Sequence, residues 1–436
     1  MTATFISAPV ERVEGQIRVP GDKSISHRAL MLGALADGTT DISGFLPGAD
    51  CLATLAALEA MGVEIQRPDA TTVRIDGCGL HGLTAPLAAL DMGNSGTAMR
   101  LFAGLLAGQK FDSTLSGDAS LSGRPMERVA EPLRLMGALI ATCGGCPPLQ
   151  ITGDQPLRGI HYEMPVASAQ VKSALLLAGL YASGSTSITE ATVSRDHTER
   201  MLSLFGWPTM LDKNRVTLRD GGCLTATRVE VPGDLSSAAF LLLAGCLAAQ
   251  GELVLEAVGL NPTRTGILRI LEMMGANLEI DEHPCEYGEP SGRIVVRPSR
   301  LHGIRIPPEF VSTAIDEFPL VFVAAALADG ETLISGAAEL RHKESDRIAV
   351  MVRGLKMLGA AVEERPDGAV IQGGGLTGGE IDSEGDHRVA MAFAVAAVAA
   401  QGPIRIRDTE NVATSFPDFV SCARSAGLKV SEGAHA

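Results

Sequence analysis

The stretch GDKSISHRALMLGALADGTTDIS, residues 21–43, contains the pattern that decides the fold. It opens with polar and charged residues, continues as an apolar run of helical length, turns at Gly38 and ends in a segment rich in β-branched residues. Because apolar residues cover nearly every side of the expected helix, that helix should lie inside its domain. The stretch therefore predicts a buried helix followed by a strand.

The same plan occurs six times along the chain. The six segments begin at Gly21, Gly93, Ala167, Gly233, Ile315 and Gly385, at intervals of 72, 74, 66, 82 and 70 residues. Each is followed by a second helical pattern that ends at a glycine, namely Gly62, Gly137, Gly206, Gly275, Gly359 or Gly427. The repeat predicts an α/β fold of two similar domains that meet near Gly233, each with three repeat units and buried helices.

Composition narrows the class of protein. The 436 residues carry a net charge of −15, which argues against nucleic-acid binding and requires any anionic substrate to meet a local basic pocket. The longest clearly apolar run, Val389–Ala400, is too short to cross a bilayer, and the N-terminus lacks a secretory pattern. We expect a cytoplasmic protein without a membrane span.

One close cysteine pair, Cys143 and Cys146 in CGGCPP, has no second pair to complete a zinc site. Metal or redox chemistry is one interpretation, and a glycine-rich turn between two strands is the one we favour. We predict neither a metal nor an organic cofactor.

Charged side chains gather at equivalent helix starts. In VPGDKSISHRA, Lys23 and Arg28 stand where backbone N–H groups and the helix dipole attract an anion, but Asp22 breaks the spacing of a nucleotide phosphate loop. Cations there oppose the dipole unless an anion compensates them. If the repeats surround an axis, these helix starts converge, and two facing domains would enclose a cleft for a highly anionic ligand. Two acids, Asp316 and Glu344, are candidates for acid–base chemistry or for structural ion pairs.

Nine ordered motifs give the chain a family resemblance. PGDKSISHRA, GNSGTAMR, GDASLSGRPM, SAQVKSALLLAG, SRDHTERML, AIDEFP, RHKESDR, GDHRVAM and ATSFPDF extend from about residue 15 to residue 430. In these motifs the sequence resembles the 5-enolpyruvylshikimate-3-phosphate synthases, the enolpyruvyl transferases of the shikimate pathway. The resemblance implies that each domain has three βαβαββ units around buried parallel helices, as in an inside-out α/β barrel. The two domains would be residues 21–233 and residues 1–20 plus 234–436, and they would close on ligand.

The resemblance also implies the reaction and its residues. The carboxyvinyl group of phosphoenolpyruvate would pass to the 5-hydroxyl of shikimate 3-phosphate, with release of phosphate. Shikimate 3-phosphate would be held by Lys23, Ser24, Arg28, Ser168, Ala169, Gln170, Arg195, Asp316 and Lys343. Phosphoenolpyruvate would be held by Lys23, Asn94, Gly96, Arg124, Gln170, Arg347 and Arg388. Catalysis would fall to Lys23, Asp316 and Glu344, in a monomeric enzyme.

Two positions bear on inhibition by glyphosate. Many family members carry a lysine where this chain has Thr414, so one expected cation is absent. The Ser-Ala-Gln and Ser-Arg-Asp-His motifs resemble a less sensitive subgroup, whose members often have alanine in place of Gly96. We expect the glycine to favour sensitivity, because it lets the backbone approach a small ligand.

Two alternatives stay open at this stage. The related UDP-N-acetylglucosamine enolpyruvyl transferases normally show an early Lys-Asn pair and a reactive loop cysteine, whereas this chain has Ser24 after Lys23 and no cysteine in the loop around Arg124. A non-catalytic repeat scaffold would have no need of cations at helix starts in different repeats.

Overall fold

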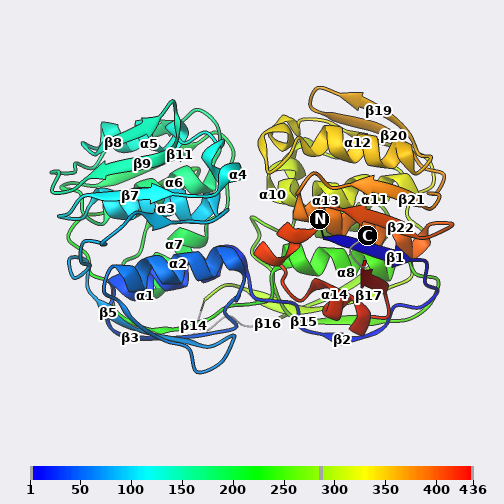
Figure 1. The fold of residues 1–436 in the computed structure, drawn as a ribbon, viewed down its shortest axis with the longest axis horizontal. Coiled ribbons are helices and arrows are strands. Elements are labelled where there is room, and N and C mark those ends of the chain that lie inside the picture. Colours follow the sequence, from blue (N-terminus) through cyan, green and yellow to red (C-terminus); the bar gives the residue numbers. More distant parts are fainter. Residues whose placement is uncertain (1–2, 284–287, 434–436) are drawn as a thin grey trace. The chain divides into compact units, whose positions relative to one another are not determined.

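The computed structural model of the protein describes residues 3–283 and 288–433. It divides into two compact units, which are described separately. The N-terminal unit contains Gly21–Val231 together with Gly288 and Glu289, and the C-terminal unit contains the described residues 3–20, 232–283 and 290–433. In the sequence colouring of Figure 1, yellow, orange and red occur only in the C-terminal unit.

The N-terminal unit repeats one order of elements three times. The first repeat contains α1 (Lys23–Leu35), β3 (Asp37–Ser43), α2 (Ala49–Ala60), β4 (Glu64–Gln66) and β5 (Val73–Cys78). The second contains β6 (Leu90–Asp91), α3 (Gly96–Ala107), β7 (Ser113–Ser116), α4 (Ala119–Ser122), α5 (Glu127–Leu135), β8 (Leu139–Cys143) and β9 (Cys146–Thr152). The third contains β10 (His161–Met164), α6 (Ala169–Gly179), β11 (Thr186–Glu190), α7 (His197–Leu204), β12 (Met210–Asp212) and β13 (Arg215–Leu218), and β14 (Arg228–Glu230) follows it.

The C-terminal unit contains the other three repeats and both described ends of the chain. Its elements before the fifth repeat are β1 (Thr4–Ala8), β2 (Gly15–Ile17), α8 (Leu235–Leu247), β15 (Leu253–Gly259), α9 (Gly266–Met273), β16 (Asn277–His283) and β17 (Ser291–Arg297). The fifth repeat contains η1 (Pro308–Phe310), α10 (Val311–Ala314), η2 (Ile315–Glu317), α11 (Phe318–Leu327), β18 (Glu331–Ile334), η3 (Ala338–His342), α12 (Arg347–Met357), β19 (Ala361–Arg365) and β20 (Gly368–Gln372). The sixth contains β21 (Gly379–Asp382), α13 (His387–Ala396), η4 (Ala397–Ala399), β22 (Ile404–Arg407), η5 (Glu410–Thr414), α14 (Phe419–Ser425) and β23 (Lys429–Glu432).

The strands form six small mixed sheets. Their strand orders are β14-β3-β5-β4, β6-β7-β9-β8 and β10-β11-β13-β12 in the N-terminal unit, and β16-β17-β15-β2, β18-β20-β19 and β21-β22-β1-β23 in the C-terminal unit. In five of them the strand after the buried helix has a parallel neighbour on one side and an antiparallel neighbour on the other. The α/β fold of repeated βαβαββ units is thus confirmed.

The ends of the chain complete sheets that lie far away in sequence. β2 precedes α1 but pairs in parallel with β15, where Gly15 lies opposite Leu253. β14 precedes α8 but pairs in parallel with β3. β1 lies between β22 and β23 and is antiparallel to both, so it supplies a strand that the sixth repeat lacks.

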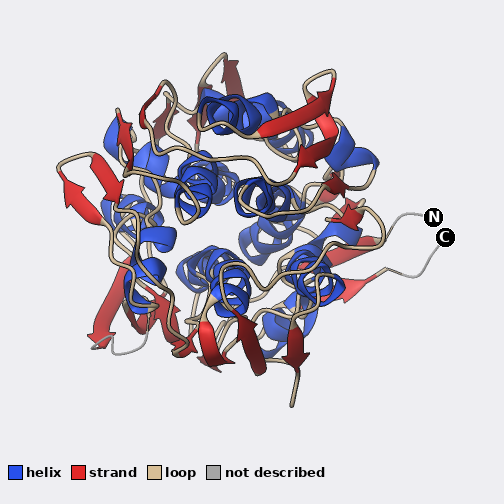
Figure 2. Ribbon diagram, turned by 90° about the vertical axis from the view of Figure 1, so that its left-hand side faces the viewer, coloured by secondary structure: helices blue, strands red, loops and turns tan. Residues whose placement is uncertain are grey.

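The first helix of each repeat is buried, as its apolar sequence predicts. Every residue of α8 from Leu235 to Cys246 is buried. In the view of Figure 2, helices lie inside and strands lie around them. α3 and α6 pack so closely that a Cβ atom on Gly104 would lie 2.1 Å from the carbonyl oxygen of Ala174. Each fully buried leucine contributes about 1.5–3 kcal/mol, so these helices supply much of the core energy. Gly104→Ala would force the two helices apart.

The second helices end where the sequence predicts. The six glycines after them, Gly62, Gly137, Gly206, Gly275, Gly359 and Gly427, all have φ between 86° and 104°. This left-handed conformation satisfies the last carbonyl groups of a helix, and only glycine adopts it without steric cost.

One helical stretch, Pro308–Leu327, is long and apolar enough to cross a membrane by length and composition alone. Its mean hydropathy is 1.7, and 67% of it is buried inside the protein. The sequence analysis did not single it out because Asp316 and Glu317 interrupt the run. Burial on this scale is what the core helix of a folded unit shows.

Candidate functional site

The start of α1 holds the first cation. The carboxylate of Asp22 caps the helix by accepting the N–H of Ile25 at 2.9 Å. Lys23 forms an ion pair with Asp50, and its side chain remains 22% exposed whereas that of Asp50 is 7% exposed. Part of the Lys23 side chain therefore faces solvent, while Asp50 fixes the direction of the side chain.

Arg28 lies deeper in the same helix and is 4% exposed. Its guanidinium donates to the hydroxyl groups of Thr198 (2.6 Å) and Ser173 (2.7 Å) and to the carbonyl of Ser24 (2.8 Å). All three partners are neutral. Burial disfavours the charged form more than nearby acids such as Glu199 favour it, and the pKa of Arg28 falls to about 10. A bound anion would relieve this cost.

The hydrogen bonds of Arg28 bring three helices together. Ser173 on α6 also donates to the carbonyl of Ala169 at 2.7 Å, and Ser168 caps α6 by accepting the N–H of Val171 at 3.4 Å. Arg195 is half-buried before α7 and close enough to Arg28 for its charge to lower the arginine's pKa. The structure therefore links Arg28 to Ala169 through Ser173 and to α7 through Thr198, and the sequence analysis missed both Ser173 and Thr198.

A second cluster in the N-terminal unit contains the predicted phosphoenolpyruvate residues. Asn94 accepts a hydrogen bond from Arg124 at 2.7 Å, and Gln170 accepts one from Arg100 at 2.7 Å. Between the two arginines lies Gly96, where an added Cβ would come within 3.0 Å of the Arg100 guanidinium and 3.3 Å of that of Arg124. Glycine at this position leaves both guanidinium groups in place.

Buried carboxylates anchor the helix that carries Thr198. Glu289 accepts a hydrogen bond at 2.7 Å from Nδ1 of His197, the first residue of α7, and its other oxygen lies 3.7 Å from Arg200. The Lys172 ammonium of α6 lies 2.8 Å from Glu199 and 2.7 Å from Glu190. Nothing local in the sequence pairs these residues, although a lysine inside the apolar run SAQVKSALLLAG signals that buried acids must face it.

The C-terminal unit brings the two candidate acids to one cation. In Arg347, the first residue of α12, Nη2 lies 2.6 Å from Glu344 and Nη1 lies 3.5 Å from Oδ1 of Asp316. The ammonium of Lys343 lies 3.5 Å from the same Asp316 oxygen. Asp316 is 15% exposed and Glu344 is 29% exposed, so both can be reached from solvent.

A third carboxylate fixes Arg347. The side chain of Asp386, the cap of α13, is fully buried and accepts from Nε of Arg347 at 2.7 Å. Burial by itself would lower the pKa of Arg347, but Asp386, Glu344 and Asp316 outweigh it and raise the pKa above its ordinary value. The sequence analysis did not identify Asp386 as the partner of Arg347.

Arg388 completes the cluster. Its guanidinium donates to the carbonyl of Asp316 at 3.1 Å and lies 3.4 Å from the carboxylate of Glu317. Thr414, which stands where many relatives have lysine, donates to the carbonyl of Asn411 at 2.7 Å and so adds no charge. These two contacts hold the Arg388 guanidinium beside Asp316 and Glu317.

The candidate residues divide between the units. Lys23, Ser24, Arg28, Asn94, Gly96, Arg124, Ser168, Ala169, Gln170 and Arg195 belong to the N-terminal unit, and Asp316, Lys343, Glu344, Arg347 and Arg388 belong to the C-terminal unit. Within residues 3–283 and 288–433, no group of three or more His, Cys, Asp or Glu side chains could hold a metal ion.

Fold and clusters together define a class: a mixed α/β enzyme of βαβαββ repeats, with cations and carboxylates at the starts of its buried helices. The family model described as EPSP synthase (3-phosphoshikimate 1-carboxyvinyltransferase) matches residues 7–422. The chain therefore belongs to the EPSP synthase family.

Relatives and a solved structure agree with this assignment over the full length. A 3-phosphoshikimate 1-carboxyvinyltransferase of Methylococcus capsulatus is 57% identical over 427 residues, which cover 98% of both chains. One of Acidithiobacillus ferrooxidans is 58% identical over 424 residues, which cover 97% of this chain and 98% of the relative. The structure of EPSP synthase from Acinetobacter baumannii superposes with a TM-score of 0.91 at 52% identity, covering 99% of this chain and 100% of that one.

The function follows from this similarity. The chain has 3-phosphoshikimate 1-carboxyvinyltransferase activity, a step of the shikimate pathway to aromatic amino acids. Both alternatives, the UDP-sugar transferase and the non-catalytic scaffold, are thereby set aside.

Proposed function

We propose that the two clusters act on one pair of substrates, phosphoenolpyruvate and shikimate 3-phosphate. The cations of the N-terminal unit would hold the phosphate and carboxylate groups, and Arg347 and Arg388 would add charge from the C-terminal unit. Arginine suits this task because its planar fork matches phosphate and carboxylate oxygens. The family match supports the pair of substrates, and the neutral hydrogen-bond partners of Arg28, together with its lowered pKa, support an anion beside it.

The reaction proceeds by addition and then elimination. Asp316 accepts the proton of the 5-hydroxyl as that oxygen bonds to C2 of phosphoenolpyruvate, while Glu344, assisted by Lys23, delivers a proton to C3. Glu344, left as a carboxylate, then takes up a methyl proton as the C–O bond to phosphate breaks and the double bond forms again, and the proton on Asp316 leaves with the phosphate. The arginines stabilise the phosphate charge, each contributing a factor of about 10² to 10³ in rate.

One observation supports these roles. Asp316 and Glu344 face two different nitrogens of the Arg347 guanidinium, at distances of 3.5 Å and 2.6 Å. A shared cation holds both carboxyl groups in fixed directions, as a pair of proton-transferring groups requires. Arg388 fixes the backbone of Asp316 as well.

The test measures phosphate release from phosphoenolpyruvate with shikimate 3-phosphate as acceptor. Asp316→Asn should lower kcat by about 10³-fold while leaving the fold intact, because the amide keeps the shape but cannot accept the proton. Asp329→Asn is the matched control, since this exposed aspartate pairs with Arg300 at the surface. Normal turnover in Asp316→Asn would remove this residue from the catalytic set.

We further infer that the enzyme is a cytoplasmic monomer that binds neither nucleic acid nor membrane. The net charge of −15 supports the part of this inference that concerns nucleic acid. Light scattering of the purified chain tests the oligomeric state, and a mass of two chains would contradict it.

A further inference from the structure

The CGGC segment forms the tip of a β-hairpin in the N-terminal unit. β8 ends at Cys143, β9 begins at Cys146, and Gly144 and Gly145 between them have φ of 60° and 86°. Two positive φ values in a two-residue connection are typical of the tight hairpin turn that the sequence led us to favour. The structure also sets the two cysteines directly opposite each other in the antiparallel ladder.

This register suits a disulfide. Residues directly opposite in an antiparallel ladder have Cα atoms about 4.5–5.5 Å apart and side chains on the same face. Disulfides join cysteines whose Cα atoms are about 4.4–6.8 Å apart. Both cysteines are free thiols, Cys143 exposed and Cys146 half-buried. Cys246, by contrast, is buried, and burial raises the pKa of its thiol to about 12.

We propose that Cys143 and Cys146 are a redox site that closes reversibly to a disulfide by exchange with a small-molecule disulfide such as glutathione disulfide. The exposed Cys143 thiolate attacks the reagent, forms a mixed disulfide and releases one glutathione thiol. The Cys146 thiolate then attacks the Cys143 sulfur and releases the second glutathione thiol. Two electrons pass from the protein dithiol to the reagent, and the two protein protons end on the two glutathione thiols.

The hairpin tip is bonded to the start of α5. The carbonyl of Gly145 accepts the N–H of Met126 at 2.8 Å, and the hydroxyl of Thr142 donates to the carboxylate of Glu127, the first residue of α5. Arg134 binds that carboxylate at 2.6 Å. Both sides of the CGGC turn therefore hold the backbone that directly follows Arg124 and Pro125.

Closing the disulfide adds a covalent link across this turn, so the Gly145 carbonyl and the Thr142 hydroxyl should shift against α5. Arg124 lies two residues before Met126, and the carbonyl of Pro125 accepts from Arg100 at 3.2 Å. We expect the oxidised chain to show a KM for phosphoenolpyruvate raised about threefold, with the KM for shikimate 3-phosphate unchanged. This second part rests on the proposed role of Arg124, whereas the disulfide itself does not.

The first experiment equilibrates the full-length chain with mixtures of reduced and oxidised glutathione, blocks the remaining thiols with a maleimide and measures the mass. The expected product has lost about 2 Da and two labelling sites, both within the peptide that contains Cys143 and Cys146, and dithiothreitol restores them. Cys143→Ser should abolish this product, and Cys223→Ser, which removes another exposed thiol, should not. A mixed disulfide that stays on Cys143 without closing would overturn the proposal.

The second experiment compares steady-state kinetics of the reduced and oxidised chain. The disulfide is coupled to phosphoenolpyruvate binding if oxidation reversibly raises the KM for phosphoenolpyruvate in the wild type but not in Cys143→Ser. An oxidised chain with unchanged kinetics overturns the coupling but leaves the redox site in place. Arg124→Ala distinguishes the remaining case: if it too leaves that KM unchanged, the proposed role of Arg124 is wrong.

Discussion

Two buried arginines, one in each unit, are stabilised in opposite ways. Arg28 in the N-terminal unit is 4% exposed and donates to two hydroxyls and a carbonyl, and its pKa is lowered to about 10. Arg347 in the C-terminal unit is 1% exposed and faces three carboxylates, and its pKa is raised. Burial acts against both charges, but only Arg347 has counter-charges that outweigh it.

The difference separates two uses of a buried cation. Three carboxylates surround Arg347 inside the protein, so besides adding charge for the ligand it fixes Asp316, Glu344 and Asp386. Arg28 keeps a charge that its neutral partners do not compensate, so an anionic ligand gains more from meeting it. We therefore expect the N-terminal unit to supply binding energy and the C-terminal unit to supply geometry for proton transfer.

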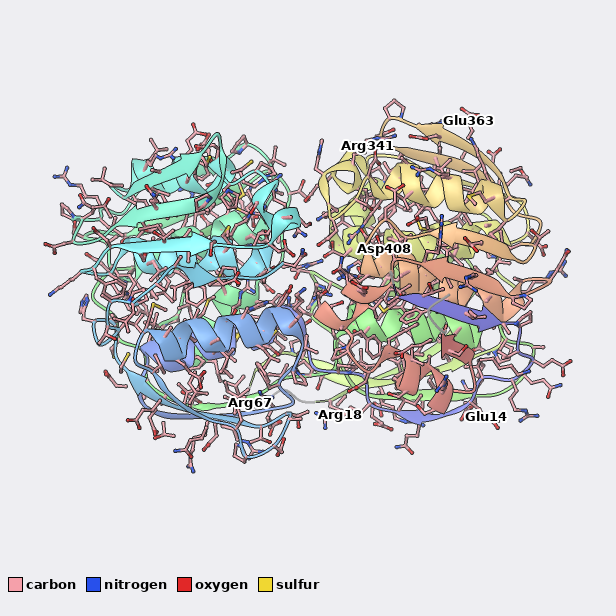
Figure 3. The ribbon with its side chains drawn as sticks, in the orientation of Figure 1. Glu14, Arg18, Arg67, Arg341, Glu363 and Asp408 are labelled. Carbon is pink, nitrogen blue, oxygen red and sulfur yellow. The ribbon has the colours of Figure 1, made fainter. Side chains whose placement is uncertain are left out.

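The largest effect should come from Arg347→Met. Removing the guanidinium leaves three carboxylates without their cation, and breaking a buried ion pair costs about 3–5 kcal/mol. Urea unfolding should show that loss, and turnover should fall by more than about 10³-fold. Arg341→Met is the control, because the ion pairs of Arg341 with Asp346 and Glu364 lie near the surface, at the position labelled in Figure 3. If both variants lose the same free energy of unfolding, Arg347 does not stabilise the buried carboxylates as we infer.

Arg28→Met tests the other half of the comparison. Calorimetric titration should show an affinity for shikimate 3-phosphate lowered by about 10²-fold, because charged hydrogen bonds to the phosphate are lost. The free energy of unfolding should fall far less than in Arg347→Met, since the lost charge was poorly stabilised. Arg67→Met, at an exposed arginine of the same unit labelled in Figure 3, should bind normally. If Arg28→Met lost as much free energy of unfolding as Arg347→Met, the two arginines would not be stabilised in opposite ways.

His27 reports on the charge around Arg28. It is fully buried, its Nδ1 lies 2.7 Å from the hydroxyl of Thr54, and burial, reinforced by Lys23 and Arg28, lowers its pKa to about 3. The unfolded chain takes up this proton near the ordinary pKa of 6.5 and the folded chain does not, so stability is lost as the pH falls. Between pH 7.5 and pH 5 this histidine should cost about 2 kcal/mol.

Urea unfolding of His27→Asn at those two pH values measures this contribution. The variant should lose about 2 kcal/mol less than the wild type between pH 7.5 and pH 5. His283→Asn removes an exposed histidine and should leave the pH dependence unchanged. Equal losses in His27→Asn and the wild type would show that His27 is not buried in its neutral form.

The smallest effect should come from Gly96→Ala. Its Cβ would lie 3.0 Å from the Arg100 guanidinium and 3.3 Å from that of Arg124, and both are ends of flexible side chains. They can move by a few tenths of an ångström, so we expect the KM for phosphoenolpyruvate to rise only about threefold. The glyphosate inhibition constant should rise more, because the added methyl group narrows the space beside the phosphoenolpyruvate site. An unchanged inhibition constant would show that Gly96 does not control sensitivity.

Local patterns in the sequence were enough to predict the architecture. In each repeat an apolar run predicts a buried helix, a glycine predicts a turn and β-branched residues predict a strand. Each of these patterns extends over only a few residues. The same locality makes the glycine after each second helix predictable. The family motifs supplied the candidate site residues because each motif is a short stretch around one helix start.

What the sequence alone determined is therefore the repeat, the buried helices and the identity of the cations and acids. Only the tertiary structure decided which neighbours those charges meet. Arg28 finds Ser173 and Thr198 at separations of 145 and 170 residues, and Arg347 finds Asp386 39 residues away on another helix. The physical reason is that the charge state of a buried group depends on the distances and polarity of all its neighbours, which are set by packing and not by spacing along the chain.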